Sequence, residues 1–379
     1  MEFALTKEQA LIQKAAREYA DKFIEPIWKQ IDEENKVPDE ILKGLGELDL
    51  FGIPFPEEYG GAGAGYVSYV LVMEQLAAAS SGIAMIVSAH TLGLGAISRF
   101  GNEEQKKKYM LKACKGEHIA SFAFTEPGTG SDPKQITTTA VKDGDSYLIN
   151  GTKRFISNAN FPGPAVIFAN ESESGKITAF IVDKSSAGYT VSEPWDKNGM
   201  HGGPLVDVYM KNVRIPAENI LGEIGMGYSI LQVGISFGKV GMSSTALGGI
   251  LAARNEAVKY AKEKTHRDLP IARFQSVQLL IADIAAKYEA CKWLTYRLGY
   301  QADHFKDPRQ FAKDAALTKT FVSESLVDAA RQAMAVHGSY GLMRDYKIER
   351  IWRDCIIGPQ IEGVSDMQKV IVANVTLNS

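Results

Sequence analysis

Residues that build disulfide or metal frameworks are scarce in this sequence. Its 379 residues include three cysteines, Cys114, Cys291 and Cys355, which lie far apart and form no CxxC pair. The six histidines are also scattered, and no HExxH pattern occurs. A disulfide framework, a zinc ribbon or a helical zinc site is therefore not expected, and the sequence predicts no metal centre. Free thiols fit a reducing compartment, so we expect a cytoplasmic protein.

Strong charge and long apolar runs are absent as well. The formal net charge is −3 at pH 7, which provides no basic field to attract nucleic acid. No run of about 18 uninterrupted apolar residues suggests a membrane span. The first residues, "MEFALTKEQALIQ", lack the basic and apolar regions of a signal peptide. The composition, 45% apolar and 23% charged, is typical of a globular protein with two or three structural units.

The pattern of apolar residues divides the chain into three parts. Residues 1–118 show helical spacing, and Thr6 with Gln9 forms a capping box at the first helix. Residues 119–222 contain short β-rich segments, including two strands around the turn residues Asp143 and Gly144. Residues 223–379 contain long helical patterns at about 226–264, 271–304 and 308–336.

We therefore predict an α+β multidomain protein. It would consist of an N-terminal α-helical domain, a middle antiparallel β domain of sandwich or barrel type, and a C-terminal four-helix-bundle domain.

Two segments of the β region have residues suited to binding a flat ligand. In "FAFTEPGTGSD" (122–132) a strand ends at Thr125, and three turn residues then expose backbone N–H groups and short hydroxyls. A plain β-turn remains an equal alternative. In "NGTKRFISNA" (150–159) the aromatic Phe155 precedes the hydroxyl of Ser157. This pair would place a ring against a flat cofactor and a donor at its edge.

A third segment, "GPQIEGVSDMQ" (358–368), places Glu362 between Ile361 and Gly363. By itself this is an ordinary helix-to-loop junction with a solvated carboxylate. Together with "TEPGTGSD", "NGTKRFISNA", "PEEYGGAG" and "VRIPAENILGEIGMGY", however, it resembles the acyl-CoA dehydrogenase family. The resemblance runs from about residue 1 to 375. It implies FAD, an acyl-CoA thioester substrate, α,β-dehydrogenation, an electron-transfer flavoprotein as electron acceptor, and usually a homotetramer.

The resemblance also implies roles for individual residues. Glu362 takes the position of the catalytic base, which removes the α-proton while the β-hydrogen leaves as hydride to the flavin. The N–H of Glu362 and the flavin ribityl chain would bind the thioester oxygen. The cofactor would contact Phe122, Phe124, Thr125, Gly130, Ser131, Phe155, Ile156, Ser157, Lys264, Arg267, Gln275, Ala335, Val336, Gly338, Ser339, Val364 and Ser365. The substrate would contact Ser131, His90, Thr91, Gly238, Val240, Gly241 and Gly363.

Several positions depart from the family pattern. Lys264 and Arg267 stand in a segment where the family usually has Arg and then Phe-Gly, and Ala335 and Ser339 replace a usual Gln and Gly. These positions usually contact FAD across a subunit boundary. The departures keep a second hypothesis open, a half-competent or non-catalytic subunit. An enoyl-CoA reductase running in the reverse direction and, last, an oxidase are further alternatives.

Some family members carry the base on another helix. The position that we match to that alternative base is Val240, which leaves Glu362 as the candidate.

The identity of the acyl group is constrained only loosely. Segment 84–95 has no Arg or Lys, so we predict a monocarboxylic acyl group. His90 can be a substrate contact, an acid–base group or a core histidine. The small residues of "GMSSTALGG" (241–249) fit either a wide pocket for a branched or alicyclic group or close helix packing.

Overall fold

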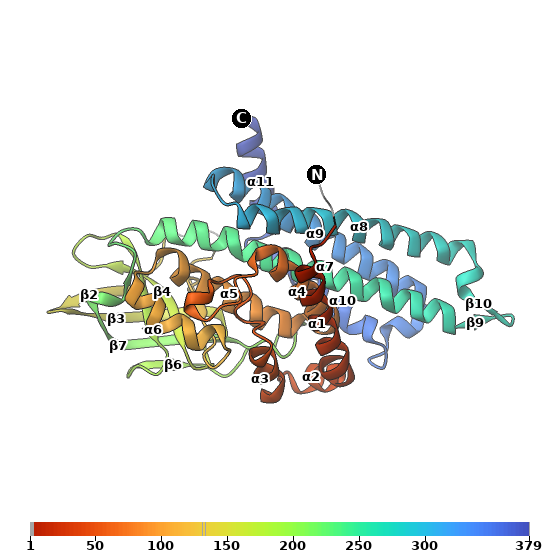
Figure 1. The fold of residues 1–379 in the computed structure, drawn as a ribbon, viewed down its shortest axis with the longest axis horizontal. Coiled ribbons are helices and arrows are strands. Elements are labelled where there is room, and N and C mark those ends of the chain that lie inside the picture. The colour runs from red at the N-terminus through yellow and green to blue at the C-terminus, as the bar shows by residue number, and fades with distance from the viewer. Residues whose placement is uncertain (1–3, 131, 133, 379) are drawn as a thin grey trace.

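The computed structural model describes residues 4–130, 132 and 134–378. The strands of the large sheet gather at one end of the molecule, the long helices extend to the other, and the N-terminal helices cover the junction (Figure 1). The predicted fold class is confirmed: helices come first, a mainly antiparallel sheet follows, and helices complete the chain. The divisions after residues 118 and 222 remain predictions, and they fall in the connections that precede β1 (Ser121–Ala123) and α7 (Gly227–Glu263).

The N-terminal part is helical, as its periodicity predicts. Thr6 and Gln9 form the predicted capping box, in which each residue's side chain accepts from the other's backbone N–H. Asn102 and Gln105 cap a later helix in the same way. The helices are α1 (Lys7–Tyr19), α2 (Trp28–Glu34), α3 (Asp39–Glu47), α4 (Gly65–Ala79), α5 (Ser81–Phe100) and α6 (Glu103–Cys114).

Helix α5 is long and apolar enough to cross a membrane by length and composition alone. However, 78% of its most apolar window is buried inside the molecule. Its apolar character therefore fits a core helix, which packs against α4 on one side and the sheet on the other.

The middle part is one connected sheet. Its strands are β1 (Ser121–Ala123), β2 (Thr139–Asp143), β3 (Ser146–Ser157), β4 (Pro164–Glu171), β5 (Ile177–Asp183), β6 (Tyr189–Val191), β7 (Leu205–Pro216) and β8 (Ile220–Leu221). They lie in the order β6-β7-β3-β2-β4-β5-β8, with β1 beside β4. Most neighbours are antiparallel, as expected, but β4 pairs in parallel with both β1 and β2. These parallel pairs are short, with three paired positions between β1 and β4 and two between β2 and β4.

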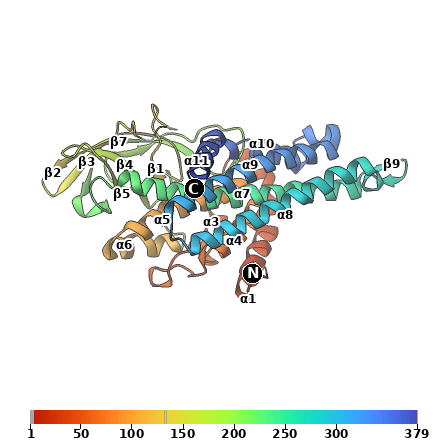
Figure 2. The same cartoon turned by 90° about the horizontal axis from the view of Figure 1, so that it is seen from above.

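The C-terminal part is built around one central helix. Its helices are α7 (Gly227–Glu263), α8 (Gln275–Asp303), α9 (Pro308–His337), α10 (Lys347–Cys355) and α11 (Ser365–Leu377), and the hairpin β9 (Thr265–His266) and β10 (Leu269–Pro270) links α7 to α8. Figure 2 shows α7 running from the sheet into the bundle beside α8 and α9. Because α7 also packs against α4 and α5, it is buried on nearly all sides for about half its length.

The small residues of α7 are explained mainly by close packing. A Cβ atom at Gly248 would lie 2.5 Å from the carbonyl oxygen of Glu74 on α4. At Gly249 it would lie 2.9 Å from a methyl carbon of Leu326 on α9. These two positions therefore favour the helix-packing interpretation of "GMSSTALGG" over a wide pocket.

Candidate active site

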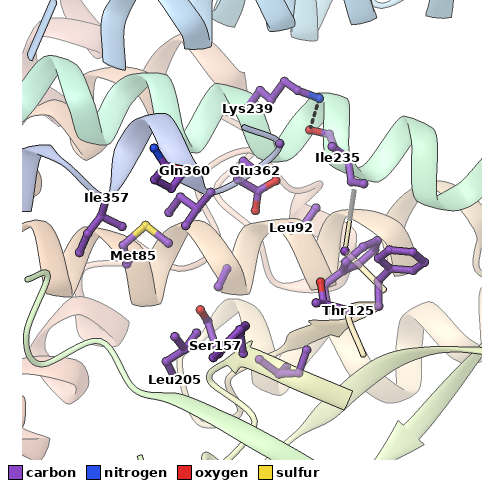
Figure 3. Close-up of a pocket in the computed structure, with 18 of the residues that line it drawn as sticks. Met85, Leu92, Thr125, Ser157, Leu205, Ile235, Lys239, Ile357, Gln360 and Glu362 are labelled. Carbon is purple, nitrogen blue, oxygen red and sulfur yellow. Dashed lines mark hydrogen bonds between the residues drawn. The ribbon is translucent and has the colours of Figure 1, made fainter. Parts of the chain in front are cut away.

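A cavity of about 660 Å³ opens where the three parts of the chain meet. Its walls come from α5, the ends of β1 and β3, the start of α7 and the segment between α10 and α11 (Figure 3). Ten of the residues that the sequence predicts to bind cofactor or substrate line it: Phe122, Phe124, Thr125, Gly130, Phe155, Ile156, Ser157, Glu362, Gly363 and Val364. The fold thus brings the three quoted segments to one site, although more than 200 residues separate the first from the last.

A buried ion pair holds the turn that carries Thr125. The carboxylate of Glu126 accepts hydrogen bonds from Lys153, at 2.8 Å, and from the backbone and hydroxyl groups of Thr137 and Thr138. Burial by itself would raise the pKa of Glu126, but the Lys153 ammonium and these hydrogen bonds outweigh it and lower the pKa to about 2. Lys153 also donates to Phe124 O, so strand β3 supports the end of β1 from behind.

A bulge in β3 places Phe155 at the cavity. The register against β7 shifts between Lys153 and Ile156, and Phe155 has φ +59°, which is uncommon for an aromatic residue. Asp207 holds this bulge, because its carboxylate accepts from the Phe155 N–H, the Trp195 indole and Arg154. The Phe155 ring remains 51% exposed and meets the Trp195 ring edge-on at 5.6 Å.

The lower wall of the cavity fits a flat ring with a polar edge, such as the isoalloxazine of FAD. Figure 3 shows Thr125 and Ser157 on the side of the cavity opposite Glu362. The apolar Phe122, Phe124 and Ile156 line the cavity as well. A Cβ atom at Gly130 would meet nothing within 4 Å, so the turn leaves space for a ligand. Ser131, predicted to contact both ligands, lies outside the described residues.

Glu362 enters the cavity from a strained corner. A short 3-10 turn, Gly358–Gln360, precedes it, and α11 begins three residues later. Glu362 has φ +52° and Gly363 has φ +88°, both in the left-handed region. At Gly363 a Cβ atom would also lie 2.1 Å from the amide nitrogen of Gln368. The backbone conformation therefore favours glycine at this position, and a larger residue would also have to displace the end of the Gln368 side chain.

Two lysines bring positive charge close to Glu362. Burial raises the pKa of Glu362, and the charges of Lys239 on α7 and Lys319 on α9 lower it in part. Burial in turn lowers the pKa of each lysine to about 8. Sequence reasoning missed both lysines, since their relation to Glu362 arises only when α7 and α9 pack beside the corner. Lys239 lines the cavity, but its ammonium group turns back along α7 to Ile235 O at 3.5 Å (Figure 3).

The structure corrects the predicted contacts on α7. Val240, matched by sequence to the alternative base position, is fully buried in the core and does not line the cavity. The residue of α7 that faces the carboxylate is Gly238, where a Cβ atom would lie 2.8 Å from Glu362 Oε2. Glycine has no side chain to act as a base, so Glu362 remains the candidate. Gly241 faces away from the cavity, against Ser88 and Tyr69.

The predicted contacts on α5 are also misplaced. His90 is fully buried, its Nδ1 accepts from the Ala120 N–H at 3.0 Å, and its ring lies edge-on to Phe51. Burial, with the charge of Lys184, lowers the pKa of His90 to about 3, so the ring is neutral. These facts fit the core interpretation of His90. Thr91 is buried as well, and the α5 residues that line the cavity are Met85, Ile86, Ala89 and Leu92.

The remaining predicted cofactor contacts lie elsewhere. Ser365 is buried at the start of α11 and does not line the cavity. The other seven lie where α7 ends, α8 begins and α9 ends, at the far end of the bundle from the sheet (Figure 1): Lys264, Arg267, Gln275, Ala335, Val336, Gly338 and Ser339. A single chain does not bring these residues to the cavity, which agrees with the implied contact across a subunit boundary.

Comparison with protein families gives three matches that cover the chain. The acyl-CoA dehydrogenase N-terminal domain matches residues 6–117, the middle domain residues 121–213 and the C-terminal domain residues 225–377. Among curated proteins, a 3-(aryl)acrylate reductase of Clostridium sporogenes is 38% identical over 97% of this chain and 98% of its own length. The caffeyl-CoA reductase-Etf complex subunit CarC of Acetobacterium woodii is 36% identical over 98% of this chain and 99% of its own.

Solved structures agree over the whole molecule. Butyryl-CoA dehydrogenase from Megasphaera elsdenii superposes with a TM-score of 0.95 at 31% identity, covering 100% of both chains. An acyl-CoA dehydrogenase from Bacillus anthracis, complexed with FAD, superposes with a TM-score of 0.92 at 32% identity, covering 99% of this chain and 67% of that one. The chain belongs to the acyl-CoA dehydrogenase family, the FAD-dependent oxidoreductases whose three domains it contains.

Proposed function

We propose that this protein removes hydrogen from the α and β carbons of an acyl-CoA thioester, with Glu362 as the base. The observation that carries the proposal is the position of Glu362. Its carboxylate lies in an apolar cavity, opposite the hydroxyl-bearing wall that fits the flavin ring. An acyl chain between the two would have its α-carbon beside the carboxylate and its β-carbon toward the ring.

The chain's own groups account for proton removal. The N–H of Glu362 donates no hydrogen bond within the described part of the chain, so it is free to bind the thioester oxygen. This bond stabilises the negative charge that develops as the α-proton leaves, an effect that is commonly worth a few kcal/mol. Substrate that fills the cavity excludes water and raises the pKa of Glu362, which makes it a stronger base. FAD, when bound, supplies the acceptor for the β-hydrogen.

The acyl group is proposed to be monocarboxylic. The part of α5 in the cavity wall, Met85, Ile86, Ala89 and Leu92, is entirely apolar. Lys239 is a cation in the wall, but its ammonium group bonds to a backbone carbonyl of its own helix. The acyl chain can be branched or alicyclic. We also propose that the protein is cytoplasmic, forms a homotetramer and transfers electrons to an electron-transfer flavoprotein.

The test is flavin reduction by a panel of thioesters. The purified holoenzyme is mixed without oxygen with straight, branched, alicyclic, aryl and dicarboxylic acyl-CoA, and bleaching of the flavin absorbance is followed. We expect at least one monocarboxylic thioester to bleach it. Glu362→Gln should abolish bleaching while FAD stays bound. Bleaching at the normal rate in this variant would move the base elsewhere, and rapid reoxidation by air would favour the oxidase alternative.

A second candidate is the reverse reaction, reduction of an enoyl-CoA thioester. It is favoured by the two reductases described above, one of which is named as a subunit of an Etf complex. The same residues serve both directions, because a group that removes the α-proton also returns it. Chemically reduced enzyme is mixed with arylacrylyl-CoA and with the enoyl products of the panel. Reoxidation by these compounds much faster than bleaching by the saturated thioesters would favour the reductase.

A third candidate is the half-competent subunit, which the departures at Lys264, Arg267, Ala335 and Ser339 suggest. It predicts a protein that purifies without FAD or only in complex with another chain. A yellow homo-oligomer with one FAD per chain would contradict it. Size measurement by light scattering tests the proposed homotetramer in the same preparation.

A further inference from the structure

The corner that carries Glu362 rests on a buried lysine of helix α9. Lys319 Nζ donates a hydrogen bond to Gly363 O at 2.8 Å and a longer one to Pro359 O at 3.5 Å. Its side chain is fully buried and does not line the cavity. The two carbonyl groups lie on either side of Glu362 in the chain. One ammonium group therefore ties down the segment that enters and the segment that leaves the proposed base.

This corner needs such support. Glu362 has φ +52° although it is not a glycine, and the next residue is also left-handed. Side chains with a Cβ rarely adopt this conformation, and it persists only where surrounding contacts hold it. Within the described residues, Lys319 is the cation that donates to a carbonyl of this corner.

The charge of Lys319 acts on the same carboxylate. The ionisable groups that face Glu362 are Lys239 from α7, Lys319 from α9 and the phenol of Tyr69 from α4. The negative charge of Glu324, on the same helix, raises the pKa of Lys319 and so favours its charged form. Both lysines donate their hydrogen bonds to backbone carbonyl groups. The Glu362 oxygens are therefore free to receive a proton. An opposite charge that is close but not bonded favours ionisation without occupying the base.

We propose that Lys319 is a positioning residue for the base: its hydrogen bonds hold Glu362 in the left-handed corner, and its charge keeps the carboxylate ionised when substrate excludes water. The inference rests on the proposed function, in which Glu362 removes the α-proton. Lys319 does not line the cavity and therefore acts through the corner.

The test compares the pH dependence of flavin reduction in two variants. Lys319→Met removes the charge and the donor, whereas Lys319→Arg keeps both. Holoenzymes are mixed rapidly with the best thioester of the panel between pH 5.5 and 9.5. In Lys319→Met the pH at which the rate of flavin reduction falls on the acid side should rise by about one unit or more, because Glu362 loses a neighbouring positive charge. The rate should then fall roughly tenfold at pH 6 and recover largely at pH 9, while Lys319→Arg stays near the wild-type profile.

A matched control separates charge from general damage. Lys347 is also a buried lysine, but it bonds to Glu25 and to Ala78 O, away from the corner. Lys347→Met should lower the melting temperature and leave the pH profile in place. If Lys319→Met does not retain FAD, Lys319→Gln, which is uncharged but polar, carries the same expectation.

The outcomes distinguish failure of the proposed function from failure of the role proposed for Lys319. If no thioester reduces the wild-type flavin, the proposed function fails and this inference falls with it. If wild type is reduced but the charge-free variant keeps its pH profile, or is slowed equally at every pH, the inference alone is overturned. A shifted profile in Lys319→Arg as well would also overturn it, because the charge would then not be the cause.

Discussion

Adding one methyl group at Gly238 is expected to slow flavin reduction strongly without removing the cofactor. The Cβ atom of Gly238→Ala would lie 2.8 Å from Glu362 Oε2, 3.2 Å from its Cδ and 3.3 Å from Leu92 Cδ1. Non-bonded atoms normally approach to about 3.5 Å, so the carboxylate must move by roughly 0.5–1 Å. The backbone at residue 238 cannot give way, because α7 is packed on nearly all sides there.

The size of the effect follows from the geometry that proton transfer requires. A misplacement of about 1 Å in an active site can cost about a hundredfold in rate. We therefore expect the rate of flavin reduction in Gly238→Ala to fall by about 10- to 100-fold, with a smaller change in thioester affinity. The measurement is stopped-flow absorbance with the best thioester, together with FAD content and melting temperature.

A matched glycine on the neighbouring helix provides the control. At Gly95 on α5 a Cβ atom would meet only Tyr66 OH, at an ordinary 3.7 Å. Gly95→Ala should keep the wild-type rate and stabilise the protein by about 0.4–1 kcal/mol, because alanine loses less conformational freedom in a helix. A normal rate in Gly238→Ala would refute the reasoning, since it would mean that the reacting carboxylate is not the one beside Gly238.

Three further predictions concern the support of the site. Lys153→Met should lower the free energy of unfolding by about 3–5 kcal/mol, because it leaves the buried Glu126 carboxylate unpaired. Since the pKa of Glu126 is lowered to about 2, its contribution in wild type is complete above about pH 5 and is lost as pH falls toward 2, which acid unfolding measures. His90→Asn should destabilise the protein yet leave the pH profile of flavin reduction unmoved between pH 5 and 9, because the histidine is already neutral there. Gly363→Ala should slow flavin reduction and lower the melting temperature, because φ +88° strains a residue with a Cβ atom and the Gln368 side chain would have to move.

Each of these has a contrary outcome. Unchanged acid stability in Lys153→Met would mean that the ion pair with Glu126 does not stabilise the turn. A displaced pH profile in His90→Asn would restore the histidine as an acid–base group. Wild-type kinetics in Gly363→Ala would show that the corner can rearrange without cost.

Local chemistry made much of the fold predictable from sequence. Capping boxes at Thr6 and Asn102, long 3.6-residue periods and short β-branched runs depend on near neighbours in the chain, so the order of helices, sheet and helices followed from them. The parallel pairing of β4 with β1 and β2 did not follow, because strand order depends on how distant segments meet. Likewise, resemblance was sufficient to indicate the segments at the cavity, since each is contiguous and carries its own turn residues.

Which residue of a helix faces the site was decided only by the tertiary structure. Successive helical residues turn by about 100°, so residues two apart point in nearly opposite directions. Gly238 therefore faces Glu362, whereas Val240, two positions further along α7, lies in the core. On α5 the same geometry sends Leu92 into the cavity and His90 into the core.

The sequence by itself determined that an acid would stand at a glycine corner, and its resemblance to the family associated this corner with the turn proposed to bind the cofactor. It left the surroundings of that acid undetermined, because they come from residues of α7 and α9, such as Lys319, which lies 43 residues before it in the chain. Packing of these helices brought Lys239 and Lys319 beside Glu362 and kept Gly238 clear of it. The pKa and position of Glu362 depend on charges and contacts across space, and for this reason only the tertiary structure decided them.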